Sequence, residues 1–267
     1  MALSARASSP QRRAVYAAAG GVFVFLMLPL AVILPVSFSS AEYLAFPPPG
    51  FSLRWYEAYF ADPVWIAATL RSLAIAGAVT VLATVLGTLL AFSIVRGRYP
   101  GRAVVSQIAT APLAVPTIVY SVAVYGLFSS LKLVGEWHGI ALAHTVHALP
   151  FVVLIMGAAL RTVDPVQEEA AMGLGASRLG AILRVTLPQL RPALVSSAFL
   201  AFISSFDELV IAMFLGGANM TLPKKMFDNI QMEIEPTVAA VAMLQIALAG
   251  LVLALAARFG SGARVLK

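Results

Sequence analysis

Apolar residues fill six long runs of the chain, and polar residues are confined to the shorter segments between them. The runs cover residues 14–36, 65–95, 103–131, 139–160, 193–215 and 237–257. A helix needs roughly 20 apolar residues to cross the hydrocarbon core of a bilayer, and each run meets that length. The pattern therefore predicts an all-α, polytopic membrane protein with six transmembrane helices.

Prolines and run lengths modify this picture. Pro112 and Pro116 fall in the third run and Pro150 in the fourth, so we expect these prolines to kink their helices. The second and third runs are long enough to tilt or to contain ends that do not span. The first run, about 23 residues long, exceeds the apolar region of a signal peptide, which is roughly 7–15 residues. We interpret it as an anchor that stays in the protein.

Composition agrees with a membrane protein and excludes several other classes. Hydrophobic residues make up 60% of the chain and charged residues 11%, against about 25% charged in ordinary soluble domains. The absence of cysteine excludes disulfides and thiolate metal sites. The net charge of +6 is scattered between the apolar runs rather than gathered on one basic face, so it does not indicate nucleic-acid binding.

The basic residues instead predict the topology. With a cytoplasmic N-terminus, thirteen fall in cytoplasmic segments, namely Arg6, Arg12, Arg13, Arg96, Arg98, Arg102, Arg161, Arg178, Arg184, Arg191, Arg258, Arg264 and Lys267. Four fall outside, namely Arg54, Lys132, Lys224 and Lys225. The positive-inside rule then places both termini in the cytoplasm. The predicted organisation is a tail over 1–13, one transmembrane domain over 14–258 with a cytoplasmic loop over 161–192, and a second tail over 259–267.

The cytoplasmic loop contains a patterned polar stretch, "EEAAMGLGASRLGAILRVTLPQLRP", at residues 168–192. Before it, Asp164 suits an N-cap position and Pro165 the first helical position, so a short helix is predicted from Pro165 to about Met172. Gly173 and Gly175 then supply residues that accept positive φ and turn the chain.

A second short helix is predicted after the turn. Ser177 suits its N-cap, and Leu179, Ile182 and Leu183 recur at helical spacing. The Leu187-Pro188 pair is expected to end it. A helix, a glycine turn and an amphipathic helix fit either a surface pair in the lipid interface or a docking element for a cytoplasmic partner, and the pattern alone leaves both open.

The same residues resemble a known family motif. Glu169-Ala170-Ala171, then Gly175, then Val185 and Leu187-Pro188 are similar to the EAA loop of bacterial ATP-binding-cassette importer permeases, with Val185 in place of the family's Ile. The resemblance to these permeases extends through "APLAVPTIVYSVAVYGLF", "AHTVHALPFVV", "SSFDELVIAMFLGG" and "TLPKKMFDNIQMEIEPTVAAVAMLQI". The last two of these stretches resemble the second permease subunit of spermidine/putrescine-type importers. Thr117 stands where some polyamine permeases carry Glu.

The resemblance implies a fold, a function and partners. It implies a type I importer permease fold in the bacterial inner membrane, pairing with a second permease subunit. An ATPase dimer beneath and a periplasmic substrate-binding protein above complete the expected assembly, with polyamines such as putrescine or spermidine as expected substrates. The residues implied to couple to the ATPase are Glu168, Glu169, Ala170, Ala171, Gly175, Leu187 and Pro188.

The chain itself is expected to be no enzyme and to bind no cofactor. It contains no G-x-x-x-x-G-K-[ST] phosphate loop, so ATP and Mg are expected on the partner ATPase. We find no catalytic set and no metal site. His144 and His147, with His138 just before their helix, are expected to pack or to hydrogen-bond to neighbouring groups; a metal site or a proton relay is the alternative.

Two carboxylates lie within the fifth apolar run. Asp207 and Glu208 carry an insertion cost of roughly 2.5–3.5 kcal/mol for Asp at the helix centre, so such groups normally face a cavity or a partner. One hypothesis is a cation pathway, with Tyr120 and Tyr125 supplying aromatic faces. The alternative is a structural pair with Arg71 or with the partner permease.

The outer loop "TLPKKMFDNIQMEIEP" predicts a further short helix near Pro223, with an apolar stripe made of Met226, Phe227, Ile230 and Ile234. Its charges, Lys224, Lys225, Asp228, Glu233 and Glu235, are candidates for contact with a binding protein.

Two other functions stay open at this point. The first is an importer permease for another small solute, such as iron, thiamine or phosphonate. The second is a secondary transporter driven by an ion gradient, with the membrane carboxylates and histidines as proton carriers.

Overall fold

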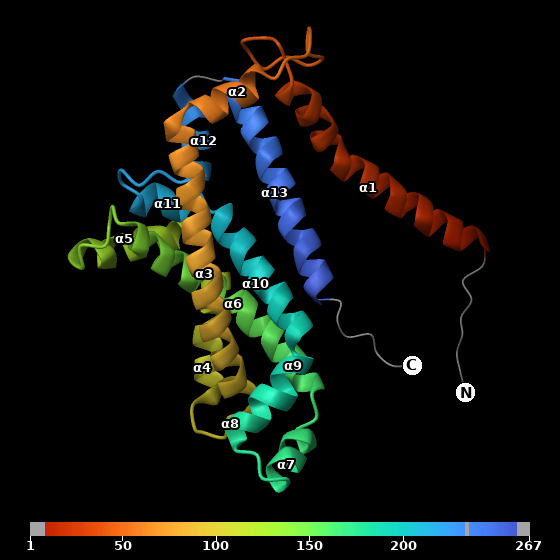
Figure 1. The fold of residues 1–267 in the computed structure, drawn as a ribbon, viewed down its shortest axis with the longest axis vertical. Coiled ribbons are helices and arrows are strands. Elements are labelled where there is room, and N and C mark those ends of the chain that lie inside the picture. Colours follow the sequence, from red (N-terminus) through yellow and green to blue (C-terminus); the bar gives the residue numbers. More distant parts are fainter. Residues whose placement is uncertain (1–8, 233–234, 261–267) are drawn as a thin grey trace. The chain divides into compact units, whose positions relative to one another are not determined.

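The computed structural model describes residues 9–232 and 235–260, and every regular element among them is helical (Figure 1). Parts of the two predicted tails lie outside the described residues, including Arg6, Arg264 and Lys267, as do Glu233 and Ile234 of the outer loop. The chain forms two compact units, one of residues 1–61 with 229–245 and one of residues 62–228 with 246–267.

The first unit begins with the long apolar helix α1 (Ser9–Ser37), followed by the short amphipathic helix α2 (Arg54–Ala61). Ser37 Oγ lies 2.9 Å from Tyr56 Oη, and the rings of Phe38 and Tyr56 pack with centroids 5.1 Å apart. These contacts hold α2 against the end of α1. The most apolar part of α1 has no buried side chains. Such a surface suits lipid or another chain rather than the interior of this one.

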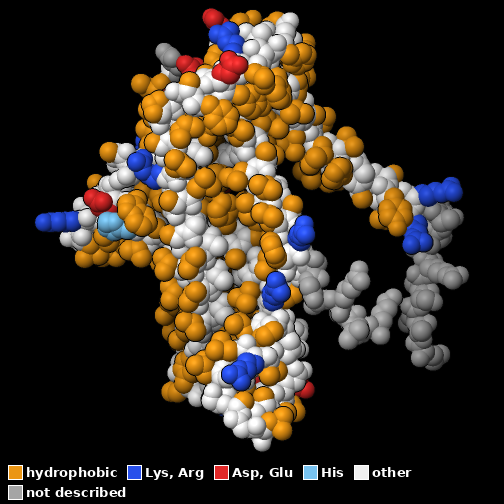
Figure 2. Space-filling view, in the orientation of Figure 1, with side chains coloured by type: hydrophobic (Ala, Val, Ile, Leu, Met, Phe, Trp, Pro, Cys, Tyr) orange, Lys and Arg blue, Asp and Glu red, His pale blue; other side chains and the backbone are white. Residues whose placement is uncertain are grey.

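The second unit holds most of the remaining helices. In chain order they are α3 (Pro63–Arg96), α4 (Arg102–Thr110), α5 (Thr117–Ser130), α6 (Trp137–Thr162), α7 (Val166–Gly173), α8 (Arg178–Ala181), α9 (Leu187–Gln189), α10 (Arg191–Phe206) and α11 (Val210–Leu215). Helices α12 (Leu222–Met232) and α13 (Thr237–Gly260) follow. Hydrophobic side chains cover most of the surface that Figure 2 shows along α3, as expected for a helix that lies in lipid.

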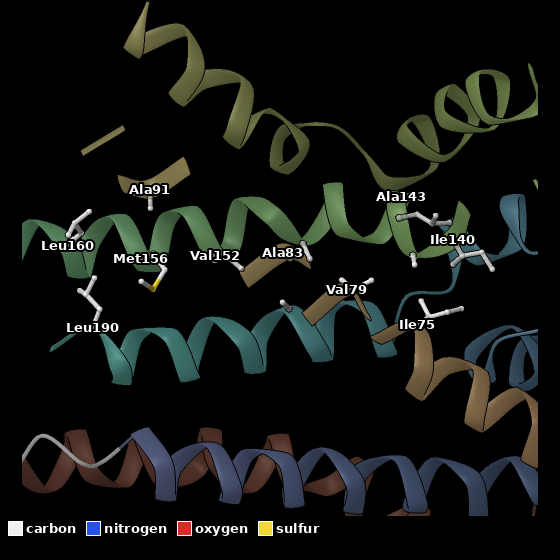
Figure 3. Close-up of a cluster of buried hydrophobic side chains, with 14 of the residues drawn as sticks. Ile75, Val79, Ala83, Ala91, Ile140, Ala143, Val152, Met156, Leu160 and Leu190 are labelled. Atoms are coloured by element: carbon white, nitrogen blue, oxygen red, sulfur yellow. The ribbon is translucent and has the colours of Figure 1, made fainter. Parts of the chain in front are cut away.

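The core of the second unit lies where α3, α6 and α10 pack side by side (Figures 1 and 3). Its α3 side is lined by Ile75, Val79 and small residues such as Ala83 and Ala91. The backbones of α3 and α6 approach closely at Gly87, where a Cβ would come within 2.7 Å of the Val152 side chain. Small residues at such a contact are typical of membrane helix packing.

The third apolar run is distorted at its prolines as expected, and the distortion is a break rather than a kink. Pro112 lies in a 3₁₀ turn over Ala111–Ala114, Pro116 precedes α5, and the helices on either side are bent by 110°. Helix α5 has 14 residues, which is about 21 Å at the α-helical rise and short of a roughly 30 Å hydrocarbon core. Pro150, by contrast, lies inside the continuous helix α6.

The fifth run also differs from a single span. Helix α10 ends at Phe206 and α11 begins at Val210, because the Glu208 side chain accepts hydrogen bonds from backbone N–H groups of α11 and so starts a new helix. Among the described residues, four helices are long and apolar enough to cross a membrane, or five if α4 and α5 count as one broken span. The apolar α10 is shorter.

Candidate functional site

The polar segment between α6 and α10 folds as its sequence indicates over its first half. Asp164 Oδ1 accepts a hydrogen bond of 3.0 Å from the Val166 N–H and so caps α7. After α7, Gly175 takes a φ of +92°, a conformation that costs roughly 1–2 kcal/mol per residue for a side chain with a Cβ. Gly173, also expected to serve the turn, is instead the last residue of α7. The turn therefore depends on Gly175.

The second half of the segment departs from expectation. Ser177 caps α8 as predicted, since its Oγ accepts from the Gly180 N–H at 3.1 Å. The prediction that Leu187-Pro188 ends this helix is wrong. A π turn over Ile182–Thr186 leads directly into α9, and Pro188 sits in the first turn of α9. The helical path therefore runs on almost to α10.

The two adjacent glutamates of the segment have different surroundings. The Glu168 residue is 9% exposed, and its Oε1 accepts a hydrogen bond of 2.7 Å from Thr186 Oγ1. The same oxygen lies 3.8 Å from Arg96 Nε. Glu169 is exposed. Glu168 thus faces the interior of the segment, and Glu169 faces outward.

Apolar side chains on the outer surface of the segment accompany Glu169. Leu174 is 91% exposed, Leu179 65% and Val166 60%. Ala170 is exposed as well, whereas Ala171 and Leu187 are partly buried. We call this set of Val166, Glu169, Ala170, Leu174 and Leu179 the outer face of the coupling segment. Leucines exposed on a polar segment indicate a surface that another molecule covers.

Beside the outer face lies a cavity of about 780 Å³ between the end of α3, the start of α4 and α7. Its lining residues are Val95, Arg96, Gly97, Arg98, Arg102, Pro165, Glu168, Glu169, Met172 and Arg178. In the sequence, Arg96 stands out only as a topology signal, and Thr186 does not stand out. No local pattern marks either residue, because their roles depend on contacts with residues far away in the chain.

The membrane carboxylates also occupy different positions. Asp207, just after α10, is exposed. Glu208 is buried, and its two oxygens accept from the N–H groups of Val210 at 3.1 Å and Ile211 at 2.7 Å. Glu208 thereby fixes the break between α10 and α11, and the break leaves Asp207 on the surface of the chain.

The buried His144 completes this arrangement. Its Nε2 lies 3.5 Å from Glu208 Oε2, and its Nδ1 lies 2.9 Å from Ser205 Oγ. His144 therefore links α6 to the ends of α10 and α11, in agreement with a packed, hydrogen-bonded histidine. His147 contacts the ring of Tyr120 at a centroid distance of 6.0 Å. The described residues contain no group of three or more potential metal ligands.

Other candidate residues are placed as follows. Tyr120 Oη donates to the Ala143 carbonyl at 2.8 Å, while Tyr125 on α5 is exposed. Arg71 donates to the Met220 carbonyl at 3.1 Å. The structural alternative that paired Glu208 with Arg71 is therefore not what the structure shows, since the Glu208 oxygens accept from the N–H groups of Val210 and Ile211 and lie beside His144.

The charges of α12 are largely engaged within the chain. Lys224 Nζ lies 2.7 Å from Asp228 Oδ2, and Lys225 Nζ lies 5.1 Å from the centroid of the Trp65 ring. The N–H of Leu222 donates to Ser72 Oγ at 2.8 Å. These contacts fasten the start of α12 to the N-terminal part of α3.

Apolar spanning helices, a polar helix–glycine–helix segment and an exposed carboxylate at a helix break together define a membrane permease subunit. Residues 83–263 match the family model described as "Binding-protein-dependent transport system inner membrane component". The chain belongs to this family, and it is a multi-pass inner-membrane permease subunit of a binding-protein-dependent importer of the ATP-binding-cassette class.

Named relatives and solved structures agree with this assignment. The chain is 35% identical to the putrescine transport system permease protein PotI of Escherichia coli (strain K12), over 86% of this chain and 84% of that protein. It is 33% identical to the spermidine/putrescine transport system permease protein PotC of Haemophilus influenzae, over 85% and 88%.

The fold is that of a bacterial ABC transporter for the acidic polysaccharide alginate, with a TM-score of 0.74 and 19% identity over 97% of this chain and 99% of that chain. A second alginate transporter structure, in complex with a pentasaccharide-bound periplasmic protein, gives a TM-score of 0.71 at 16% identity, over 94% and 95%.

Proposed function

We propose that this permease subunit imports polyamines, with putrescine or spermidine as substrate. The observation that carries the proposal is the likeness, at 35% and 33% identity over most of the chain, to permeases named for putrescine and for spermidine/putrescine. Both substrates are cations. A carboxylate exposed within an apolar segment is a feature that a cation pathway requires.

In this proposal Asp207 is the residue of the chain that meets the substrate, with Tyr125 as an aromatic face nearby in the pathway. Asp207 is exposed and follows the last residue of α10. Glu208, held by α11 and His144, positions it, and Tyr120 supports α6 through the Ala143 carbonyl. The proposed pathway set is thus Asp207, Glu208, Tyr120 and Tyr125, with Asp207 in direct contact.

In this proposal, the coupling segment transmits the free energy of ATP hydrolysis to the permease subunit. We infer that the outer face docks on a separate ATPase dimer, which binds ATP and Mg, while this chain hydrolyses nothing and binds no cofactor. A second permease subunit would cover the exposed apolar helices, and a periplasmic substrate-binding protein would deliver the substrate. This arrangement requires the coupling segment, and with it both termini, to be cytoplasmic. The residues of this chain that we assign to coupling are the two glutamates, the two alanines, Gly175 and the Leu187-Pro188 pair.

Affinity purification of the tagged chain from its own membranes tests the assembly. The expected result is recovery of an ATPase and a second permease in stoichiometric amounts, lost when Gly175→Pro removes the turn. Recovery of the chain alone would refute it.

Uptake by the recovered complex in proteoliposomes then tests the substrate. We expect labelled putrescine or spermidine to be imported and Asp207→Asn to reduce that import. Uptake of iron, thiamine or phosphonate in place of either polyamine would refute the substrate assignment.

A further inference from the structure

We propose that Glu168, Arg96 and Thr186 form an internal clamp that transmits the movement of the coupling segment to α3 and α6, whereas Glu169 alone of the two glutamates contacts the ATPase. The inference rests on the proposed function of this segment as the ATPase dock. It assigns two adjacent glutamates, Glu168 and Glu169, to different steps of coupling.

The first part of the clamp joins α3 to α6. Arg96 is the last residue of α3, and its Nη2 donates to the carbonyls of Val163 at 2.6 Å and Leu160 at 3.4 Å. The last carbonyls of an α-helix have no partner within the helix, and a cation near them is favourable. One guanidinium therefore fastens the end of α3 to the end of α6.

The second part joins α7 and the π turn to the same guanidinium. Glu168 Oε1 accepts from Thr186 Oγ1 at 2.7 Å and lies 3.8 Å from Arg96 Nε. Thr186 is fully buried, and the side chains of Arg96 and Glu168 are 18% and 12% exposed. Charges so far removed from water interact more strongly than surface ions. The carboxylate is thus the point at which both arms of the coupling segment meet the transmembrane helices.

The separation between Glu168 and Arg96 in the clamp can become shorter. Arg96 Nε is buried and has no hydrogen-bond partner among the described residues. An approach of about 0.8 Å between α7 and α3 would bring the 3.8 Å separation from Glu168 Oε1 to roughly 3.0 Å, the usual length of an N–H···O hydrogen bond. A movement of α7 toward α3 therefore strengthens the contact between Glu168 and Arg96, and the displacement is transmitted to α3 and α6.

The outward glutamate takes no part in this network. Glu169 is exposed and lies on the outer face with Leu174. Because it follows Glu168 directly on a helix, its side chain points about 100° away around the axis. The two carboxylates therefore face different molecules, one this chain and the other its partner.

The test compares docking with coupling in the complex purified through the tagged chain. Docking is measured as the amount of ATPase that is retained on the tagged chain. Coupling is measured as the amount of substrate imported per ATP hydrolysed in proteoliposomes. We expect Glu169→Arg to lose the ATPase. We expect Glu168→Gln to retain it while coupling falls about tenfold. Arg96→Gln should behave like Glu168→Gln, whereas the matched control Arg161→Gln, at an exposed arginine near the end of α6 and outside the clamp, should couple like the wild type.

A second pair keeps the test decisive if the charge variants assemble poorly. Thr186→Ser retains the hydroxyl that binds Glu168 and should couple normally, while Thr186→Val removes it and should not. Loss of ATPase from Glu168→Gln to the same extent as from Glu169→Arg would overturn the inference, as would wild-type coupling in both Glu168→Gln and Thr186→Val. Absence of any ATPase on the wild-type chain would instead refute the proposed function on which the inference rests.

Discussion

The same chemical change at the adjacent carboxylates Asp207 and Glu208 is expected to affect different properties of the protein. Replacement of either by its amide removes one charge at nearly constant shape. Glu208 holds two backbone N–H groups of α11, and the nearer donor, Ile211, is completely buried. Asp207 is exposed. We therefore expect Glu208→Gln to lower stability and Asp207→Asn to lower transport.

The magnitude for Glu208→Gln follows from its contacts. The amide keeps one acceptor oxygen and replaces the other by an NH₂ donor, so one of the N–H groups of Val210 and Ile211 loses its acceptor. A buried donor left without an acceptor costs about 1–3 kcal/mol. For a chain of this size, about 2 kcal/mol corresponds to a fall in Tm of roughly 4–8 °C. Asp207→Asn, exposed and without such partners, should change Tm by under about 2 °C, since surface substitutions usually stay within ±0.5 kcal/mol.

The assay measures Tm of the purified complex at one fixed scan rate, together with polyamine uptake at a temperature well below Tm. Asp207→Asn should reduce uptake severalfold at unchanged Tm. Glu208→Gln should show the larger loss of Tm. An equal fall in Tm for both variants would refute the difference in burial between the two carboxylates, and a fall for Asp207→Asn alone would show that their burial is reversed.

Three further substitutions test the packing and the coupling segment. Gly87→Ala places a Cβ within 2.7 Å of Val152 and should destabilise the purified chain by about 1–3 kcal/mol, measured by its Tm; Val152→Ala should not restore the Tm, because the Cβ of residue 152 itself lies 2.7 Å away. Gly175→Ala should cost about 1–2 kcal/mol, because φ is +92° there, and should reduce ATPase retention, whereas Gly173→Ala, in a helix with no atom near its Cβ position, should retain the ATPase fully. Ser177→Ala removes the cap on α8 and should speed amide hydrogen exchange over residues 178–181 by roughly fivefold, as expected for a loss of about 1 kcal/mol. Ser177→Asp supplies another capping oxygen and should keep the exchange as slow as in the wild type.

Features that depend on neighbouring residues were predictable from the sequence. The caps by Asp164 and Ser177, the turn at Gly175 and the distortion near Pro112 and Pro116 are all present. Each depends on a side chain meeting its own backbone or on the restricted φ of proline.

Features that depend on contacts between distant parts of the chain could not be predicted from the sequence. Glu168 and Glu169 are chemically the same, and only the packing of α7 against Arg96 and Thr186 distinguishes them. The separation of α10 from α11 likewise depends on Glu208 capping α11 beside His144, and an apolar run gives no sign of it. The continuation past Leu187-Pro188 arises from a π turn, which has no simple sequence pattern.

We propose above all that a separate ATPase drives transport through the outer face of the coupling segment. Uptake of labelled putrescine or spermidine by the purified complex in proteoliposomes, with the binding protein on one side and Mg-ATP on the other, tests it most directly. We expect uptake that requires both ATP and the binding protein and is abolished by Glu169→Arg. Uptake by this chain alone under an ion gradient, without ATP, would contradict it.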